Sequence, residues 1–335
     1  MKISASVYSN KKDDLKAIIK NLDDNQVDFF HIDCNDDPSV FGDILEIRKH
    51  SQKPIDLHII TETPERYYEY LERVPVEYVT FQYENLKEKL QIPKSIKGKK
   101  GLAIVTPTPI KVFEEYAADF DFILIMATIP GKSGGSFDPI NFRKIRQFNK
   151  LFPNKRIHVD GGVNGEVSFI IRNMGVYAAV SGSYLFNEGQ VGKALLNLKV
   201  TDTASHYLVK DFMRTGDEVP VLPPNKRSLK DVLLSIEQHD MGFTMLSNHA
   251  GQLEGLISNA DVRRGLIKHI DNIAETSIED MVNNKPVTIN ENDTVADLLK
   301  TIKAKSFPIS FLPVVDDDKK VRGAVTFFNL VKGEF

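Results

Sequence analysis

The sequence has no tryptophan, a single cysteine and no long apolar run. With Cys34 as the only thiol, a framework of internal disulfides is excluded, and a reducing compartment is favoured. No stretch approaches the ~20 consecutive apolar residues of a membrane span, and the first residues, MKISASVYS, lack the apolar core of a signal peptide. We therefore expect a cytoplasmic protein with no membrane partner.

An excess of charge of one sign is also missing, because 43 Lys and Arg residues stand against 46 Asp and Glu residues, for a formal net charge of −3. This balance excludes a broad basic surface, so no nucleic-acid partner is expected. The hydrophobic share of 41% and the charged share of 27% are ordinary for folded chains and exclude wholesale disorder. At ~100–200 residues per domain, the 335 residues predict two or three domains.

From residue 1 to about 200, short β-rich runs alternate with amphipathic stretches of helical period. Eight such runs, with helices at most of the intervals, predict a parallel α/β array that right-handed crossovers can close into a (β/α)8 TIM barrel. An open, doubly wound sheet is the alternative. The expected strands are 2–8, 29–34, 55–60, 78–83, 101–105, 122–127, 156–162 and 178–183, and the clearest helices are 13–24, 63–74 and 140–152.

Beyond residue 200 the chain repeats itself, at offsets of 66 to 69 residues. Each copy is expected to contain a short strand, a helix, two strands around a polar turn and a closing helix. One copy is too small to bury a good core alone. We therefore expect one smaller α+β module over 201–335, in which copies 207–272 and 273–335 pack together. The matched positions are Asp211 and Asp280, Pro220 and Pro286, Ser228 and Thr294, and Gly255 and Gly323.

Polar side chains recur two residues apart near the ends of three predicted strands, where this spacing puts them on one face. Strands of a parallel barrel are normally apolar on both faces, and active sites of this fold lie at the strand ends. Two His and two Asp from these pairs would suit one divalent metal, such as Zn, Fe, Mn or Co. Hydrogen-bonded core residues are the alternative. The pairs are His31 and Asp33, Asp56 and His58, and His158 and Asp160.

Glycines follow the last three predicted strands of the barrel region. Backbone N–H groups of glycine loops at this end of a barrel form a phosphate pocket, although ordinary turn chemistry could explain each loop alone. A phosphorylated small molecule is therefore a candidate ligand. The positions concerned are Gly131, Gly134, Gly161, Gly162, Gly182 and Ser183.

Taken in order, these residues resemble the ribulose-phosphate 3-epimerase family over residues 1–200. The resemblance lies in Ser4–Val7, the H-x-D and D-x-H strands, the segment Met126 to Gly134, and the last two strand ends. It implies that His31, Asp33, His58 and Asp160 bind one divalent metal, and that Asp33 and Asp160 are the acid/base pair. The implied substrate-binding residues are Ser6, His58, Met126, Gly131, Gly134, Gly161, Gly162, Gly182 and Ser183.

The implied reaction is the 3-epimerisation of D-ribulose 5-phosphate to D-xylulose 5-phosphate through an enediolate, with a carboxylate on each face of the substrate. Departures from the family leave the substrate open: Asn35 and Ile60 stand at methionine positions, and Gln82 at a histidine position. Another ketose phosphate, such as allulose 6-phosphate, is one alternative, and a non-catalytic nucleotide-sensing subunit is the other. Asp56 is a candidate supporting residue for the metal ligands or an ordinary buried residue.

The C-terminal region resembles a tandem pair of CBS domains, most closely the tail of arabinose-5-phosphate isomerases. That resemblance implies that Ser258 and Asp261 bind the ribose of a regulatory nucleotide or nucleotide-sugar, and that the protein is a homo-oligomer. The second copy has Asn329 at the acid position, so one good site is expected. Two other readings stay open: Ser258 and Asp261 can cap a helix, and the pair can serve assembly only.

Overall fold

The computed structural model describes residues 1–128, 135–187, 190–199, 207–305 and 309–327. The chain divides into two compact units, with described residues 1–199 in the first and 207–327 in the second. Each unit has its own core, and each is described by itself.

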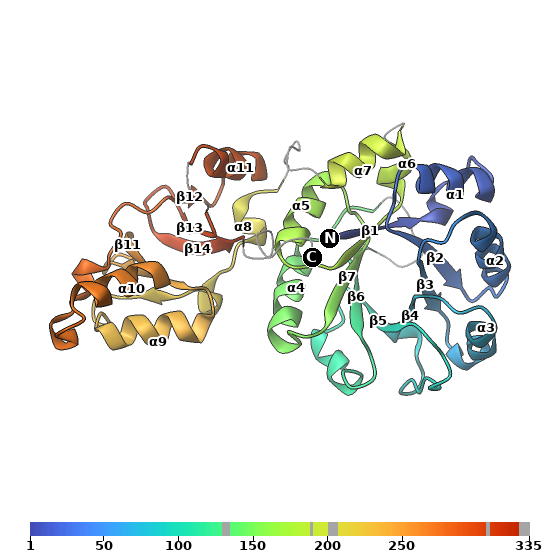
Figure 1. The fold of residues 1–335 in the computed structure, drawn as a ribbon, viewed down its shortest axis with the longest axis horizontal. Helices are drawn as coiled ribbons and strands as arrows, with labels where there is room; N and C mark the ends of the chain where they lie inside the picture. The colour runs from blue at the N-terminus through green and yellow to red at the C-terminus, as the bar shows by residue number, and fades with distance from the viewer. Residues whose placement is uncertain (129–134, 188–189, 200–206, 306–308, 328–335) are drawn as a thin grey trace. The chain divides into compact units, whose positions relative to one another are not determined.

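The first unit is a closed barrel of eight parallel strands in chain order, so the TIM-barrel prediction is confirmed and the open sheet is wrong. Apolar residues on both faces of most strands explain why helices and loops cover the outside while side chains fill the inside. Figure 1 shows the strands around a common axis. They are β1 Lys2–Ser6, β2 Phe29–Asn35, β3 Ile55–Ile60, β4 Tyr78–Gln82, β5 Lys99–Val105, β6 Phe122–Met126, β7 Arg156–Asp160 and β8 Ala178–Ser181.

The helices of the barrel lie outside the strands (Figure 1) and begin at good capping residues in two clear cases. Asp14 accepts a hydrogen bond from Ala17 N at the start of α1, and Asn164 accepts one from Val167 N at the start of α5. The helices are α1 Leu15–Asp24, α2 Val40–His50, α3 Tyr68–Arg73, α4 Ile140–Leu151, α5 Gly165–Asn173, α6 Ser183–Asn187 and α7 Val191–Lys199.

Two crossovers depart from the expected βα pattern. The connections after β4 and β5 contain only short 3₁₀ helices, Tyr83–Asn85 and Ile110–Glu115, and further 3₁₀ turns lie at Val7–Ser9 and Pro64–Tyr67. Across both described units, none of the helices combines the length and the apolar composition that a membrane span requires. The cytoplasmic location stays a prediction.

The interior of the barrel has a buried aromatic layer, further from the carboxyl ends of the strands than the polar residues. The His158 ring stacks on Phe122 at a centroid distance of 4.1 Å and lies 5.5 Å from the ring of Tyr78. Burial lowers the pKa of His158 to about 4, so this histidine is neutral in the core. Its partner in the sequence pattern, Asp160, lies one layer higher, at the end of β7.

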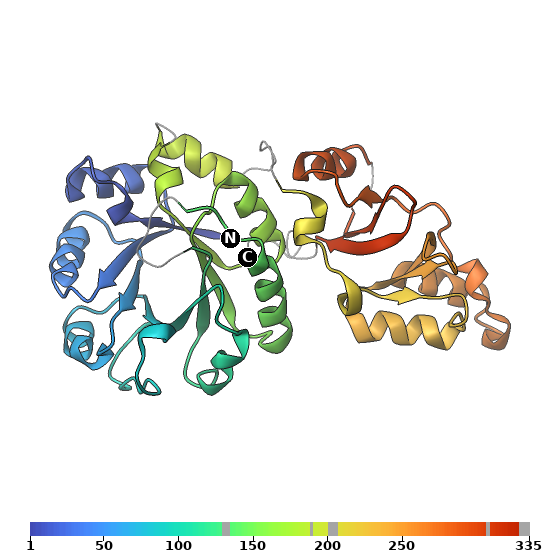
Figure 2. The ribbon, with the colours of Figure 1, turned by 180° about the vertical axis from the view of Figure 1, so that it is seen from behind.

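The second unit contains two three-stranded sheets of the same design, which matches the internal repeat (Figures 1 and 2). In each sheet the central strand pairs parallel with a short first strand and antiparallel with the last one. The first copy has β9 Val221–Leu222, α9 Leu229–His239, β10 Phe243–Ser247, β11 Leu253–Ser258 and α10 Asn259–Lys268. Before β9 the chain forms α8 Val209–Phe212 and a 3₁₀ turn at Gly216–Glu218. The second copy begins with 3₁₀ turns at Ile273–Glu275 and Ile278–Asp280, followed by β12 Ile289–Asn290, α11 Val295–Lys303, β13 Phe311–Val315 and β14 Val321–Thr326.

The two copies contact each other through side chains and backbone. The rings of Phe243 and Phe311 stack at 4.0 Å, and Leu253 N donates to Lys319 O at 2.8 Å. These contacts bury apolar surface that one copy alone would leave exposed. The closing helix expected in the second copy falls at residues 328–335, outside the described ranges.

Candidate active site

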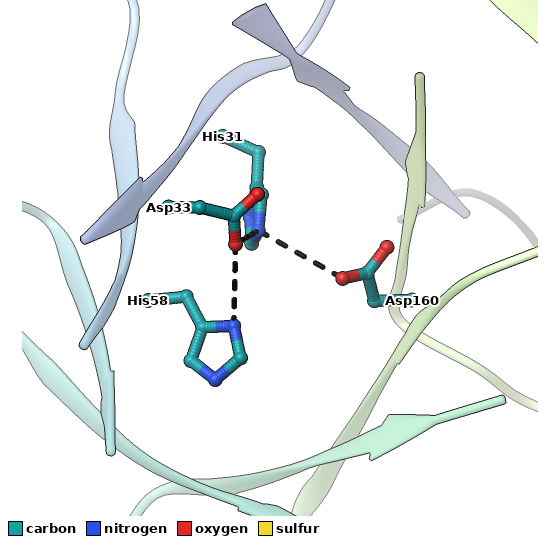
Figure 3. A group of neighbouring side chains, drawn as sticks. All are labelled: His31, Asp33, His58 and Asp160. Carbon is teal, nitrogen blue, oxygen red and sulfur yellow. Dashed lines mark hydrogen bonds and ion pairs between the residues drawn. The ribbon is translucent and has the colours of Figure 1, made fainter. Parts of the chain in front are cut away.

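Four polar side chains meet at the carboxyl ends of three barrel strands. His31 and Asp33 come from β2, His58 from β3 and Asp160 from β7, and one ligand atom of each lies within 4.8 Å of the others. Figure 3 shows the four side chains pointing toward a common centre. Both imidazoles are fully buried, whereas the Asp33 and Asp160 side chains are 22% and 19% exposed. The predicted cluster is therefore assembled, with its carboxylates toward solvent.

The closest atoms of this cluster are suited to binding a cation. His31 Nε2 lies 3.2 Å from Asp33 Oδ1 and 4.0 Å from Asp160 Oδ2, while His58 Nδ1 lies 3.4 Å from Asp33 Oδ1. Among the described residues, this buried His58 nitrogen has no hydrogen-bond partner. An orphaned imidazole nitrogen beside two carboxylates is a donor set that a divalent metal would satisfy.

The second nitrogen of each imidazole is hydrogen-bonded to a side chain outside the cluster. His31 Nδ1 lies 3.0 Å from Asp56 Oδ2, which also accepts a hydrogen bond from Ser4 Oγ at 2.8 Å. His58 Nε2 lies 2.8 Å from Gln82 Oε1. Such partners orient histidine ligands and fix their tautomers. Asp56 thus has the contact expected of a supporting residue, whereas the place of Gln82 beside His58 was not predicted from the sequence.

The two carboxyl groups have opposite pKa shifts. Burial alone would raise the pKa of Asp33, but the nearby His31 and His58 outweigh it and hold that pKa well below its usual range. Burial raises the pKa of Asp160 to about 6, and the neighbouring Asp33 adds to this shift. Burial would lower the pKa of His31, but Asp33 and Asp56 outweigh it and raise the pKa well above its usual value.

The glycines after β7 have backbone positions that exclude other side chains. Gly161 has φ +105° and Gly162 has φ +66°, which L-residues rarely adopt. A Cβ on Gly162 would lie 2.2 Å from Phe137 N. The chain therefore presents bare backbone at this strand end, as a phosphate pocket needs. Gly131 and Gly134 lie outside the described residues.

The remaining predicted substrate residues lie at the same end of the barrel. Ser6 ends β1 and accepts a hydrogen bond from Ser9 Oγ at 3.0 Å, and a Cβ on Gly182 would come within 3.2 Å of Ser6 Cβ. Ser183 begins α6 directly after Gly182. Met126 is buried at the end of β6, in register with Asp160 on the neighbouring strand.

In the second unit, Ser258 and Asp261 form a reciprocal helix cap. Ser258 N donates to Asp261 Oδ2 at 2.9 Å, and Asp261 N donates to Ser258 Oγ at 3.3 Å, at the start of α10. Asp261 also pairs with Arg264. The same capping box begins α9 and α11, so these hydrogen bonds are explained by capping alone.

The two units of the chain match different protein families. A family model described as "Ribulose-phosphate 3 epimerase family" matches residues 2–186, more than half of the chain. The chain belongs to the ribulose-phosphate 3-epimerase family. A model described as "CBS domain" matches residues 278–333, the second copy of the C-terminal repeat. The predicted family, the barrel followed by a CBS-like module and the enzyme class, an epimerase-type isomerase, are confirmed.

Curated relatives cover the epimerase unit at modest identity. The ribulose-phosphate 3-epimerase of Methanocaldococcus jannaschii is 30% identical over 226 residues, covering 64% of this chain and 95% of that protein. The Bacillus subtilis enzyme of the same name is 26% identical over 213 residues, covering 59% and 98%. The crystal structure of CBSX2 in complex with AMP covers 38% of this chain and 95% of that chain, with 24% identity and a TM-score of 0.32.

Proposed function

We propose that the barrel is a metal-dependent 3-epimerase that interconverts D-ribulose 5-phosphate and D-xylulose 5-phosphate. One observation carries the proposal: two carboxylates and two imidazoles converge at the strand ends of a barrel of this family. Two relatives from different organisms, both named ribulose-phosphate 3-epimerase, support the choice of substrate.

Inversion at C3 requires that one proton leaves from one face of the carbon and another arrives on the opposite face. Asp33 and Asp160 come from β2 and β7 and face the centre of the cluster from different sides (Figure 3). One carboxylate takes the C3 proton, which leaves a planar enediolate, and the other carboxylic acid returns a proton to the opposite face. Each transfer contributes ~10²–10⁴-fold to the rate.

The two carboxyl groups differ in how readily they hold a proton before a metal ion binds. Because His31 and His58 hold the pKa of Asp33 low, Asp33 is ionised and can act as the base. In the metal-free protein, burial raises the pKa of Asp160 to about 6, so Asp160 holds a proton near neutrality more readily than Asp33 does, and a bound metal ion would lower this pKa. A pair whose environments separate their pKa values is what an acid and a base need. The two roles exchange in the reverse reaction.

A divalent ion held by His31 Nε2, His58 Nδ1 and the carboxylates of Asp33 and Asp160 would stabilise the negative charge that develops on the enediolate oxygens. Two nitrogen and two carboxylate donors suit Zn²⁺, Fe²⁺, Mn²⁺ or Co²⁺. The chain's own part is to hold the imidazoles at fixed angles and to place both carboxylates beside the substrate.

The substrate is tested by comparing kcat/KM for D-ribulose 5-phosphate and D-allulose 6-phosphate. Asn35 and Ile60 end β2 and β3 opposite each other in register, so both lie at the mouth of the site and can influence substrate choice. We expect the pentulose phosphate to be preferred. A higher kcat/KM for allulose 6-phosphate would contradict the proposed substrate and favour the sister epimerase.

Removal of the substrate phosphate should greatly reduce turnover. The backbone at Gly161, Gly162, Gly182 and Ser183 would bind the phosphate, and this remote binding energy would orient C3 between the carboxylates. We expect a kcat/KM for free D-ribulose at least ~10²-fold below that for the phosphate ester. Equal values for the two sugars, measured in the same coupled assay, would contradict a phosphate pocket.

For the CBS-like module we propose a regulatory nucleotide or nucleotide-sugar site at Ser258 and Asp261 in a homo-oligomeric enzyme. The support is the family match of the second copy and the internal repeat. Calorimetry with AMP, ATP and CMP-sugars should give heat with the full-length protein and none with Asp261→Ala. Asp231→Ala, which removes the equivalent cap of α9, is the matched control. Unchanged heats in the Asp261 variant, or no heat with any ligand, would contradict the site.

A further inference from the structure

We propose that Gln82 and Glu84 are positioning residues that fix which nitrogen of His58 carries the proton, and thereby aim the Nδ1 lone pair at the centre of the cluster. The inference rests on the metal centre proposed above. Neither residue belongs to the predicted site, and both follow from contacts at the end of β4.

The contact between Gln82 and His58 defines the tautomer. Gln82 Oε1 lies 2.8 Å from His58 Nε2, and an amide oxygen can only accept a hydrogen bond. His58 Nε2 must therefore carry the proton. Because neutral imidazole has one N–H, Nδ1 keeps its lone pair, and this nitrogen lies 3.4 Å from Asp33 Oδ1. Figure 3 shows the two His58 nitrogens on opposite sides of the ring, with one toward Asp33.

The Gln82 amide needs a second residue to set its direction. A carboxamide can present either its oxygen or its NH₂ group to a neighbour, and the NH₂ group would favour the opposite His58 tautomer. Gln82 Nε2 donates to Glu84 Oε2, and a carboxylate can only accept. The NH₂ end of the amide is therefore directed to Glu84, and the oxygen end to His58.

Glu84 is itself held by the neighbouring strand. Its Oε1 accepts hydrogen bonds from Val105 N at 3.0 Å and from Thr108 Oγ1. The ammonium group of Lys144, buried under the same segment, donates to Val105 O at 2.8 Å and to Thr108 O at 2.7 Å. The acceptor that orients Gln82 is thus fixed by the end of β5 and by α4, independently of the cluster.

The two imidazoles differ in this respect. His31 Nδ1 lies beside Asp56, a carboxylate, which accepts a hydrogen bond through whichever oxygen faces the ring. His58 meets an amide, whose two ends have opposite hydrogen-bonding character, so the direction must be imposed by Glu84. This difference explains why Asp56 alone can fix the tautomer of His31, whereas both Gln82 and Glu84 are needed to fix that of His58.

The direct test is the tautomer of His58 in the full-length protein. ¹⁵N-histidine-labelled protein is studied by long-range ¹H–¹⁵N correlation, at a pH of about 9 so that free imidazoles are neutral, both metal-free and with Zn²⁺. We expect the His58 proton on Nε2 in both samples, and an unprotonated Nδ1. A proton on Nδ1 in the metal-free protein would overturn the proposal.

Variants test the consequence for metal affinity, measured by competition for Zn²⁺ with a chromophoric chelator. Gln82→Leu removes the acceptor at nearly constant volume and should weaken Zn²⁺ binding ~10–100-fold. Thr80→Val is the matched control, because Thr80 is also buried on β4 and its Oγ1 has no partner among the described residues. This control should leave the affinity unchanged.

Glu84 gives a second test at an exposed position. Glu84→Gln keeps an acceptor and should retain Zn²⁺ affinity, whereas Glu84→Lys only donates, reverses the Gln82 amide and should weaken binding. Unchanged affinity in both Gln82→Leu and Glu84→Lys would overturn the proposal. If the wild-type chain bound no Zn²⁺, Mn²⁺ or Co²⁺, the proposed metal centre would be contradicted. The tautomer of His58 in the metal-free protein would still test the roles of Gln82 and Glu84.

Discussion

Asp33→Asn and Asp160→Asn are each expected to lower kcat/KM for epimerisation by more than ~10³-fold. Either change removes a proton carrier and one negative charge from the set of metal-binding groups, while the shape of the side chain is kept. In the proposed mechanism the two carboxylates act on opposite faces of one carbon, so neither can replace the other. The measurement is a steady-state assay of xylulose 5-phosphate formation at saturating metal.

A matched control is available at the opposite end of the barrel. Asp121 accepts a hydrogen bond from Lys100 N at 2.9 Å just before β6, far in the fold from the strand ends that hold the cluster. Asp121→Asn also removes one carboxylate charge, and we expect it to affect stability rather than turnover. A rate near that of the wild type in either Asp33→Asn or Asp160→Asn would contradict the assigned chemistry.

Removal of the metal is expected to have the second-largest effect. Without a divalent charge beside the enediolate, stabilisation worth several kcal/mol is lost, so activity after treatment with a chelator should fall by ~10³-fold or more. Restoring Zn²⁺, Mn²⁺ or Co²⁺ should bring activity back. Full activity in protein shown by elemental analysis to be free of metal would contradict the metal-dependent reaction.

Metal binding should also release protons near neutral pH. The pKa of His31 is raised well above its usual value by Asp33 and Asp56 against the effect of burial, and burial raises that of Asp160 to about 6. Both groups must give up their protons to bind a cation, so we expect release of about one proton or more per metal at pH 6–7. Calorimetry in buffers of different ionisation enthalpy measures this number, and no release would indicate that the metal binds elsewhere.

Two simple regularities of the sequence lead to three pairs of polar residues, and the family resemblance selects from them the four that lie together. Alternation in a strand puts His31 and Asp33 on one face, and parallel strands bring their carboxyl ends together. The same spacing does not give the depth of a residue in the barrel. His158 has the pattern of its neighbour Asp160 but lies in the aromatic layer, because only the register of neighbouring strands sets the layer.

Contacts between strands are harder to predict. The role proposed for Gln82 depends on the register of β3 and β4, in which His58 lies opposite Thr80, and on a side chain that reaches across from two residues further along. Ser258 and Asp261 show a different limit. Their spacing suits both a helix cap and a ribose, and the observed hydrogen bonds satisfy the cap without any ligand.

The most direct measurement is exchange at C3 in D₂O. The metal-loaded protein is incubated with D-ribulose 5-phosphate, and the sugar phosphates are followed by ¹H NMR. Since Asp33 and Asp160 exchange their protons with solvent between turnovers, we expect deuterium at C3 of xylulose 5-phosphate and, on equilibration, of ribulose 5-phosphate. Xylulose 5-phosphate formed without deuterium at C3, or no exchange at all with metal bound, would contradict proton transfer by this pair of carboxylates.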